Sequence, residues 1–162
     1  MKNILYILII LLTSSCGLVK NTFSEKKSLT CPIIEDNAIN DWNNLTGKWY
    51  GKCKLKNNTI QEWLADRNND GHYVIEFKTI NEDGDNFKQI EKGEWGISGN
   101  VYFTIFKSYI INNYEETVDS TDAYARDTYK VFKLNNKIFK YRHIRTGENF
   151  KAEKVDSSFT LQ

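Results

Sequence analysis

The chain has 162 residues and a formal net charge of +1 at pH 7, with 22 basic and 21 acidic side chains. A balance so close to neutral gives no electrostatic basis for nucleic-acid binding, and the length suits one domain with one sizeable core. Aromatic residues make up 14% of the chain, and with frequent Asn-Asn and Asp-Gly pairs they favour an all-β fold.

Residues 1–15 have the pattern of a secretory signal peptide: a basic start, a short apolar run and small residues. The apolar run is too short to be a permanent membrane-spanning helix. The sequence Leu12-Thr13-Ser14-Ser15-Cys16 resembles the lipobox of bacterial lipoproteins, in which the cysteine is lipidated and becomes the mature N-terminus. The resemblance implies that Cys16 carries palmitate and that the protein is anchored in the cell envelope. The alternative is an ordinary signal peptide with an incidental cysteine.

The residue after the cysteine and the segment that follows it extend this interpretation. The residue that follows Cys16 is Gly17 and not an aspartate. This resembles the pattern that sorts bacterial lipoproteins to the outer membrane, and it implies an outer-membrane anchor that faces the periplasm. Residues 16–41 are polar and show no sustained period, so we expect a tether between the lipid and a folded domain.

The remaining cysteines, Cys31 and Cys53, are candidates for a disulfide in an oxidising compartment. The bridge would close a loop of about twenty residues and contribute on the order of 3 kcal/mol. The alternative is two free thiols. The two histidines, His72 and His143, lie far apart and no Cys-x-x-Cys occurs, so we expect no metal and no cofactor.

The folded domain is expected over residues 42–156, and a short helical turn at 41–45 is expected to lead into its first strand. Apolar and polar residues alternate there between turn signals, which indicates strands with one buried and one exposed face. Residues 112–127 are polar and acidic and are expected to form the one long loop, and residues 157–162 a frayed tail. The expected strands, the fourth interrupted by a bulge or corner near Gly93, are 48–56, 62–67, 72–79, 87–97, 101–111, 129–134, 138–144 and 149–155.

About eight strands joined mostly by short turns predict an antiparallel up-and-down meander. Such a meander commonly closes into a barrel because closure removes exposed edges. An eight-stranded barrel is about wide enough to hold one small ligand.

A Gly-x-Trp motif lies at the start of the first strand, within Leu45-Thr46-Gly47-Lys48-Trp49-Tyr50-Gly51. The motif and the meander resemble the lipocalin and fatty-acid-binding superfamily over residues 42–156. The resemblance implies that Trp49 closes one end of the barrel and that Arg142 or Arg145 stacks over it, a structural cation–π contact. The C-terminal helix of typical lipocalins is absent, and a clear Thr-Asp-Tyr-like motif at a later turn is not found.

Several aromatic and charged residues have a strand position that could turn them into the barrel. The alternatives are a packed core without a cavity and, for the charges, a structural ion pair. Further candidates in the long loop, for a lid at the barrel mouth, are Asp122, Tyr124, Arg126 and Asp127. The ligand-binding candidates are Trp63, Arg67, Tyr73, Phe77, Glu91, Tyr102, Phe106, Tyr141 and Arg142, with Tyr129, Phe139 and Phe150 as further interior aromatics.

These features favour a membrane-anchored barrel that binds a small hydrophobic or amphipathic ligand. The rival is a protein-interaction module of the envelope, with the Lys-rich outer face of the first strand and the acidic 112–127 stretch as contact surfaces. We expect no enzyme, because no nucleophile motif occurs and Glu91 and Glu94, three apart on a strand, face opposite sides. An empty interior would favour ligand binding, and a filled interior would favour protein interaction.

Overall fold

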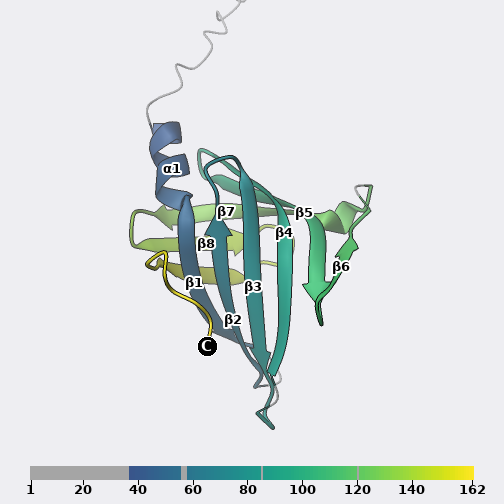
Figure 1. Ribbon diagram of the computed structural model, residues 1–162. Helices are drawn as coiled ribbons and strands as arrows, with labels where there is room; N and C mark the ends of the chain where they lie inside the picture. The colour runs from purple at the N-terminus through teal and green to yellow at the C-terminus, as the bar shows by residue number, and fades with distance from the viewer. Residues whose placement is uncertain (1–36, 56–57, 85, 120) are drawn as a thin grey trace, which may run out of the picture. The chain divides into compact units, whose positions relative to one another are not determined.

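The computed structural model describes residues 37–55, 58–84, 86–119 and 121–162 (Figure 1). The signal segment, Cys16 and Cys31 lie outside the described residues. The elements are α1 (Asn37–Leu45), β1 (Gly47–Lys54), β2 (Ile60–Arg67), β3 (His72–Ile80), β4 (Asn86–Ser98), β5 (Val101–Ile111), β6 (Tyr114–Thr117), the 3-10 helix η1 (Ala123–Ala125), β7 (Arg126–Leu134), β8 (Ile138–His143) and β9 (Asn149–Lys154).

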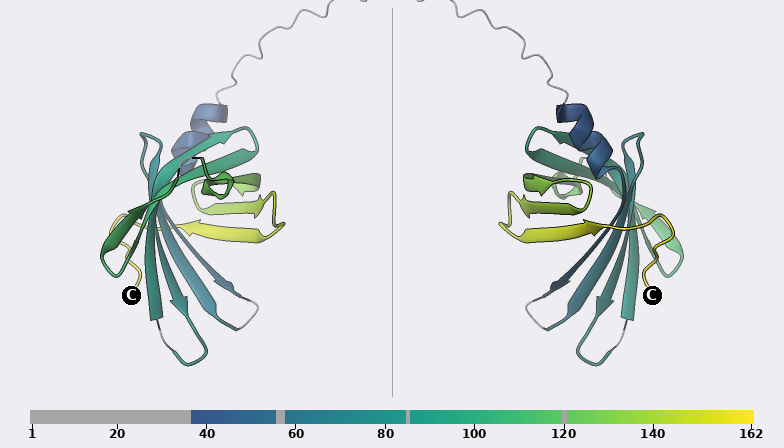
Figure 2. Two further views of the ribbon diagram at one scale, coloured as in Figure 1. Left: turned by 90° about the vertical axis from the view of Figure 1, so that its right-hand side faces the viewer. Right: turned by 90° about the vertical axis from the view of Figure 1, so that its left-hand side faces the viewer.

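The predicted eight-stranded antiparallel up-and-down barrel is confirmed. Strands β1 to β5 pair in sequence order, β5 pairs with β7, and β7, β8 and β9 follow, each antiparallel to its neighbour. The pairing of β9 with β1 closes the barrel. Strand β6 pairs with the C-terminal residues of β5, from Ser108 to Ile111, and is additional to the eight barrel strands. Figure 1 shows β7 and β8 crossing behind β1–β4, and Figure 2 shows the two sets of strands from the sides.

The predicted interruption near Gly93 is a shift of register between Lys92 and Gly93, where β4 pairs with β5. A Cβ atom at Gly93 would lie 2.2 Å from the main-chain oxygen of Ile105 and 2.7 Å from the Tyr73 hydroxyl. Glycine is therefore required here because the neighbouring backbone comes too close for a side chain.

Helix α1 covers the end of the barrel at which β1 begins (Figure 1). It is longer than the helical turn expected at 41–45. Trp49 is fully buried beneath it and donates a hydrogen bond from Nε1 to the Leu45 oxygen at 2.9 Å. Trp42 stacks on Trp95 of β4 at 4.2 Å between ring centroids. These contacts make this end the closed end of the barrel.

Trp49 is a core residue, as expected, but the predicted arginine over its ring is wrong. The cation is Lys154, whose Nζ lies 5.4 Å from the ring centroid and donates to the Asn44 oxygen at 3.0 Å. Lys154 reaches this place because it pairs directly with Trp49 in the β1–β9 register. Arg142 and Arg145 contact Asn149 and Asp127 instead.

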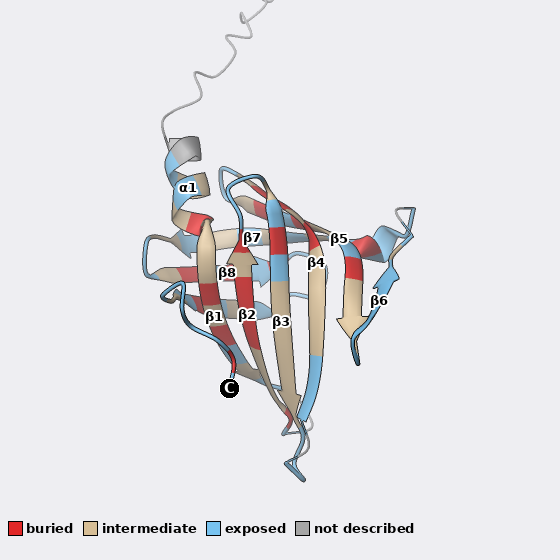
Figure 3. Cartoon of the chain, in the orientation of Figure 1, coloured by how far each residue is buried: buried red, intermediate tan, exposed pale blue. Residues whose placement is uncertain are grey.

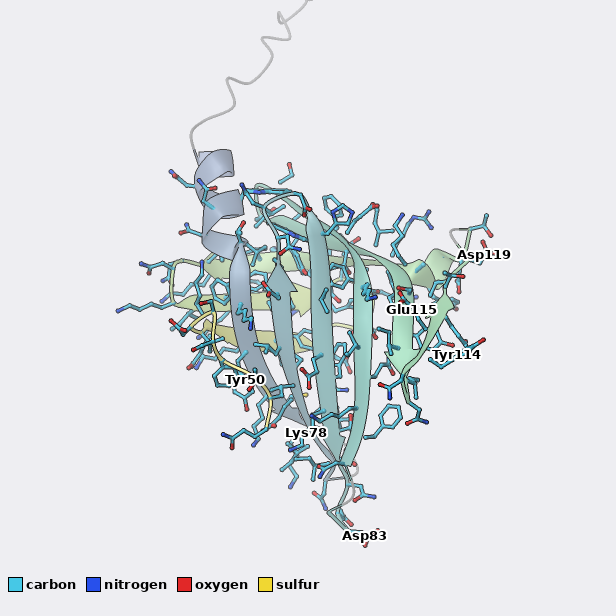
Figure 4. All side chains as sticks on the ribbon, in the orientation of Figure 1. Tyr50, Lys78, Asp83, Tyr114, Glu115 and Asp119 are labelled. Atoms are coloured by element: carbon cyan, nitrogen blue, oxygen red, sulfur yellow. The ribbon has the colours of Figure 1, made fainter. Side chains whose placement is uncertain are left out.

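The C-terminal residues do not fray, so that expectation is wrong. Leu161 is only 8% exposed, and the rings of Tyr50 and Phe159 lie 5.4 Å apart. Lys48 and Lys78 donate from Nζ to the Phe159 and Gln162 oxygens at 3.1 and 2.6 Å. The C-terminal segment therefore packs against the outer face of β1–β3, beside β1 in Figure 3 and near the labelled Tyr50 and Lys78 in Figure 4.

The 112–127 stretch is not simply a loop, because it contains β6 and η1. Asn112 and Asn113 both have positive φ, at 52° and 64°, and connect β5 to β6 as a two-residue hairpin turn. All four residues of β6 are exposed, so no apolar alternation indicated the strand. The labelled Tyr114 and Glu115 of β6 lie at the outer edge in Figure 4.

Candidate functional site

A cavity of about 430 Å³ lies inside the barrel, so the alternative of a packed core without a cavity is wrong. Eight of the nine ligand-binding candidates line it. Gln61, Ile75 and Thr104 also line it and were not identified from the sequence, because they are neither aromatic nor charged. The eight candidates in the lining are Trp63, Arg67, Tyr73, Phe77, Glu91, Tyr102, Phe106 and Tyr141.

Much of the wall consists of aromatic rings in mutual contact. Tyr129 packs against Tyr102 and Tyr141 with both centroid distances at 5.3 Å, and Tyr141 stacks on Phe150 at 5.2 Å. Burial raises the pKa of the Tyr129 and Tyr141 hydroxyls above the ordinary value, so both are neutral at physiological pH. The wall therefore offers apolar ring faces and neutral hydroxyl groups to a ligand.

Arg67, at the end of β2, is the buried cation of the cavity and is only 3% exposed. Its Nε and Nη2 atoms donate to the Tyr102 hydroxyl oxygen at 3.2 and 2.9 Å. The guanidinium carbon lies 5.0 Å from the Tyr102 ring centroid and 5.8 Å from that of Phe139. Within the described part of the chain, Nη1 is buried without a hydrogen-bond partner.

Glu91 of β4 contributes an acidic group to the same lining. Burial is the main cause that raises its pKa to about 7, and the nearby Asp127 charge raises it further. The Gln89 side chain opposes this by donating from Nε2 to Glu91 Oε1 at 2.9 Å. Near neutral pH the Glu91 carboxyl is therefore partly protonated and can donate as well as accept a hydrogen bond.

An ion-pair cluster fixes the 112–127 stretch to the turn after β8. Asp127 Oδ1 lies 2.8 Å from His143 Nε2 and 3.3 Å from Arg145 Nη2, and the Arg145 guanidinium lies 4.8 Å from the Tyr124 ring centroid. The Thr146 main-chain N–H donates to His143 Nδ1, which places the imidazole proton of a neutral ring on Nε2, facing Asp127. Tyr124, 74% exposed, and Asp127 both line the cavity, so this stretch lies at its mouth.

This cluster explains why Arg145 does not stack over Trp49. Arg145 is held at the mouth by Asp127 and Tyr124, whereas Trp49 lies at the closed end beneath α1. The predicted stacking of Arg145 on Trp49 is therefore wrong. Arg145 instead contacts Asp127 and Tyr124.

Arg142 is the one ligand-binding candidate that does not reach the cavity. Side chains alternate along β8, so Tyr141 faces inward and Arg142 faces out. Arg142 donates from Nε to Asn149 Oδ1 at 3.0 Å, and its guanidinium lies 5.2 Å from the exposed Phe132 ring. The interior position predicted for Arg142 is wrong.

The two contact surfaces of the rival interpretation are partly occupied within the chain. On β1, Lys48 and Tyr50 contact the C-terminal segment, and Lys52 pairs with Glu62 at 2.8 Å. On β6, Glu115 pairs with Lys92 at 3.0 Å. Neither surface is therefore a simple run of unpaired charges.

Cys53 carries a free thiol, so the predicted Cys31–Cys53 disulfide has no support in the structure. Among the residues that the structure describes, no group of three or more His, Cys, Asp or Glu side chains is placed to hold a metal ion. Over the same residues, none of the helices combines the length and apolar character needed to cross a membrane.

Comparison of the chain with known proteins found no matching family model and no significant match among curated proteins. The function must therefore be argued from the cavity and its chemistry.

Proposed function

We propose that this protein is a lipid-anchored, lipocalin-like barrel of the bacterial cell envelope that binds one small hydrophobic or amphipathic ligand. The observation that carries the proposal is the cavity of about 430 Å³, which lies in the size range of small-molecule sites. Its lining combines aromatic ring faces with polar and charged side chains, Arg67 and Glu91 among them, which suits an amphipathic ligand.

Binding would be driven by transfer of the ligand's apolar part from water to the aromatic wall. Each methylene group buried there contributes about 0.8 kcal/mol. The polar groups of the lining would fix the orientation of the ligand, because an unmatched polar group in the cavity would lose its hydrogen bonds to water. A lipid on Cys16 would keep the barrel beside a membrane that supplies or receives the ligand.

Native mass spectrometry with solvent extraction tests the binding claim. The protein is a Cys16→Ser form, exported and purified without detergent. We expect an additional mass that extraction removes and that identifies the class of ligand. As a control, Thr104→Phe and Ile75→Trp each add bulk to the cavity lining and should reduce that mass while the fold is retained by circular dichroism. A wild-type protein without bound mass, and without uptake of offered fatty acids or phospholipids, would refute ligand binding.

The anchor is tested separately by growing cells that express the protein with labelled palmitate. The wild-type chain should incorporate the label and sediment with membranes, and the Cys16→Ser form should do neither. Incorporation that persists in the Cys16→Ser form would contradict lipidation at Cys16.

A second candidate, a protein-interaction module of the envelope, is favoured by exposed aromatic rings outside the cavity. Tyr114 is 69% exposed, and Phe132 is 53% exposed between Lys130 and Arg142. Exposed aromatic and arginine side chains are common at protein interfaces. Photo-cross-linking from position 132 in cells would capture an envelope protein if this candidate is right, and none if Phe132 only faces solvent.

A further inference from the structure

The outer face of β7, β8 and β9, which lie side by side in Figure 2, gathers basic side chains around one exposed aromatic ring. The whole chain has a net charge of only +1, so the excess of positive charge is local. Among the described residues, Lys151 alone of these cations has a carboxylate partner, Glu153 at 2.6 Å. This basic face consists of the exposed residues Lys130, Phe132, Lys133, Lys140, Arg142 and Lys151.

The sheet register sets cations of the basic face directly opposite one another. Lys140 lies between Lys133 of β7 and Lys151 of β9, and Lys130 is paired with Arg142. Like charges directly opposite each other destabilise a sheet, because their side chains stand close together on one face. An anion bound over these pairs would relieve the repulsion.

A lysine pair on another part of the barrel shows how such repulsion is compensated within the chain. Lys88 of β4 is paired with Lys78 of β3, but Lys88 Nζ lies 3.5 Å from Glu76 Oε1, and Lys78 Nζ donates to the Gln162 oxygen at 2.6 Å. The cations of the basic face other than Lys151 have no such carboxylate within the described part of the chain. Solvent or a bound partner must therefore compensate their charge.

A β-bulge turns Phe132 outward beside these cations. The β7–β8 register shifts between Val131 and Lys133, and Phe132 and Lys133 follow each other on the exposed side. The Phe132 ring is 53% exposed, and its centroid lies 5.8 Å from Lys130 Nζ and 5.2 Å from the Arg142 guanidinium carbon. An exposed ring next to several cations is typical of surfaces that bind at the interface of a membrane.

An open groove of about 460 Å³ lies on the same face. Its lining includes Phe132, Lys140, Arg142 and Lys151. Arg142 donates from Nε to Asn149 Oδ1 at 3.0 Å, which fixes the guanidinium and leaves its two Nη groups for an anion. Arginine and lysine side chains are the usual protein groups that bind phosphate. The groove therefore suits the phosphate group of a lipid headgroup.

The composition of the basic face favours a membrane over a protein as its partner. Four of its five cations are lysines, and it has one aromatic ring. Lysine is depleted at protein interfaces, where arginine and aromatic residues are enriched. A membrane with anionic lipids attracts each nearby lysine or arginine through its surface potential.

We propose that the basic face docks on the surface of a membrane that contains anionic lipids, with a lipid phosphate in the groove and the Phe132 ring among the headgroups. This docking uses the outside of the barrel and goes beyond the proposed function, which uses the cavity. A lipid on Cys16 would keep the barrel near a membrane, and the basic face would set the orientation of the barrel on it.

Co-sedimentation of the Cys16→Ser form with lipid vesicles tests docking without a contribution from the anchor. Vesicles of equal parts phosphatidylcholine and phosphatidylglycerol should bind the protein on the order of 100-fold more tightly than vesicles of phosphatidylcholine alone, because each cation near an anionic surface strengthens binding about fivefold. The affinity should fall steeply when salt is added, since salt screens exposed charges.

Two double substitutions with the same change in net charge locate the binding surface. Lys140→Gln with Arg142→Gln neutralises two cations of the basic face and should weaken binding to anionic vesicles about 25-fold. Lys88→Gln with Lys107→Gln neutralises two lysines of β4 and β5, which pair with glutamates at 3.5 and 3.4 Å, and should leave binding nearly unchanged. Phe132→Ser should weaken binding about tenfold, because it removes the ring that enters the headgroup layer.

Several outcomes would overturn this inference and leave the cavity proposal untouched. Equal binding to both kinds of vesicle, or no binding to anionic vesicles, would refute it. An equal loss in the two double variants would also refute it, because the net charge and not the basic face would then decide binding. In cells, a photo-cross-linker at position 132 should be recovered on lipid, and recovery on a protein alone would make the face a protein interface. The vesicle comparison uses the unaltered face, so it decides the matter even if a variant fails to fold.

Discussion

The most direct test of the electrostatics of the cavity is Glu91→Gln, which removes the charge of a partly buried carboxyl and preserves its shape. Burial raises the Glu91 pKa from an ordinary value of 4.5 to about 7. The folded protein therefore binds a proton at Glu91 more tightly than the unfolded chain between these two pH values. The stability that this proton contributes is complete below pH 4.5 and is lost as the pH rises to about 7.

The size of the effect follows from the shift. At 1.36 kcal/mol for each pH unit, a rise from 4.5 to about 7 corresponds to about 3 kcal/mol. Glu91 is not completely buried, so solvent screening lowers the expected effect to about 2 kcal/mol. Glu91→Gln should equal the wild type in stability at pH 4 and exceed it by about 2 kcal/mol at pH 8.

Urea unfolding followed by circular dichroism at pH 4, 6 and 8 measures this difference. The control is Glu94→Gln on the other side of the same strand, where the Glu94 side chain is 46% exposed and pairs with Lys107 at 3.4 Å. It should leave the pH dependence of the wild type unchanged. If Glu91→Gln is as stable as the wild type at pH 8, or less stable, the carboxyl does not bear a desolvation cost and the reasoning fails.

Three further predictions concern the fold. Gly93→Ala should lower the free energy of unfolding by about 3 kcal/mol, because its Cβ would overlap the Ile105 backbone. The control is Gly84→Ala, which lies in open space at φ +86° and should lower the free energy of unfolding by only about 1 kcal/mol in the same urea titration. Leu161→Ala should cost about 2 kcal/mol, and no change in midpoint would show that the C-terminal segment is not docked. Cys53 should be alkylated in denaturant without reductant, and mass spectrometry that finds it blocked would contradict a free thiol.

The strands could be predicted because each carries its own pattern. In β1 the alternation of Trp49 and Gly51 with lysines marks the buried face, and Asp70-Gly71 marks the hairpin to β3. Strand β6 carries no such pattern because both of its faces are exposed, although the Asn112-Asn113 turn was a usable signal. Docking of the C-terminal segment depends on contacts with β1–β3 that are remote in sequence, so local pattern could not indicate it.

Whether a side chain faces the barrel interior depends on its position in the alternation along the strand. This alternation explains which of the interior positions predicted from the sequence are right and which are wrong. Arg67 and Glu91 are placed correctly because the β2–β3 and β3–β4 pairings keep an unbroken register at these residues, and the register shift near Gly93 affects only the β4–β5 pairing. Arg142 was misplaced because the neighbouring Tyr141 takes the interior position. The partner of Trp49 was also missed, since whether Lys154 or an arginine reaches its ring depends on the β1–β9 register, which sequence alone does not set.

The central claim is that the barrel cavity binds a small hydrophobic or amphipathic ligand. A crystal structure of the Cys16→Ser form with 10-bromodecanoate tests it, because the anomalous signal of bromine shows whether the ligand lies inside the barrel. The account predicts continuous ligand density and a bromine peak within the cavity that Phe77 and Phe106 line. A cavity that contains no ligand density, or bromine peaks only on the outer face of the barrel, would contradict it.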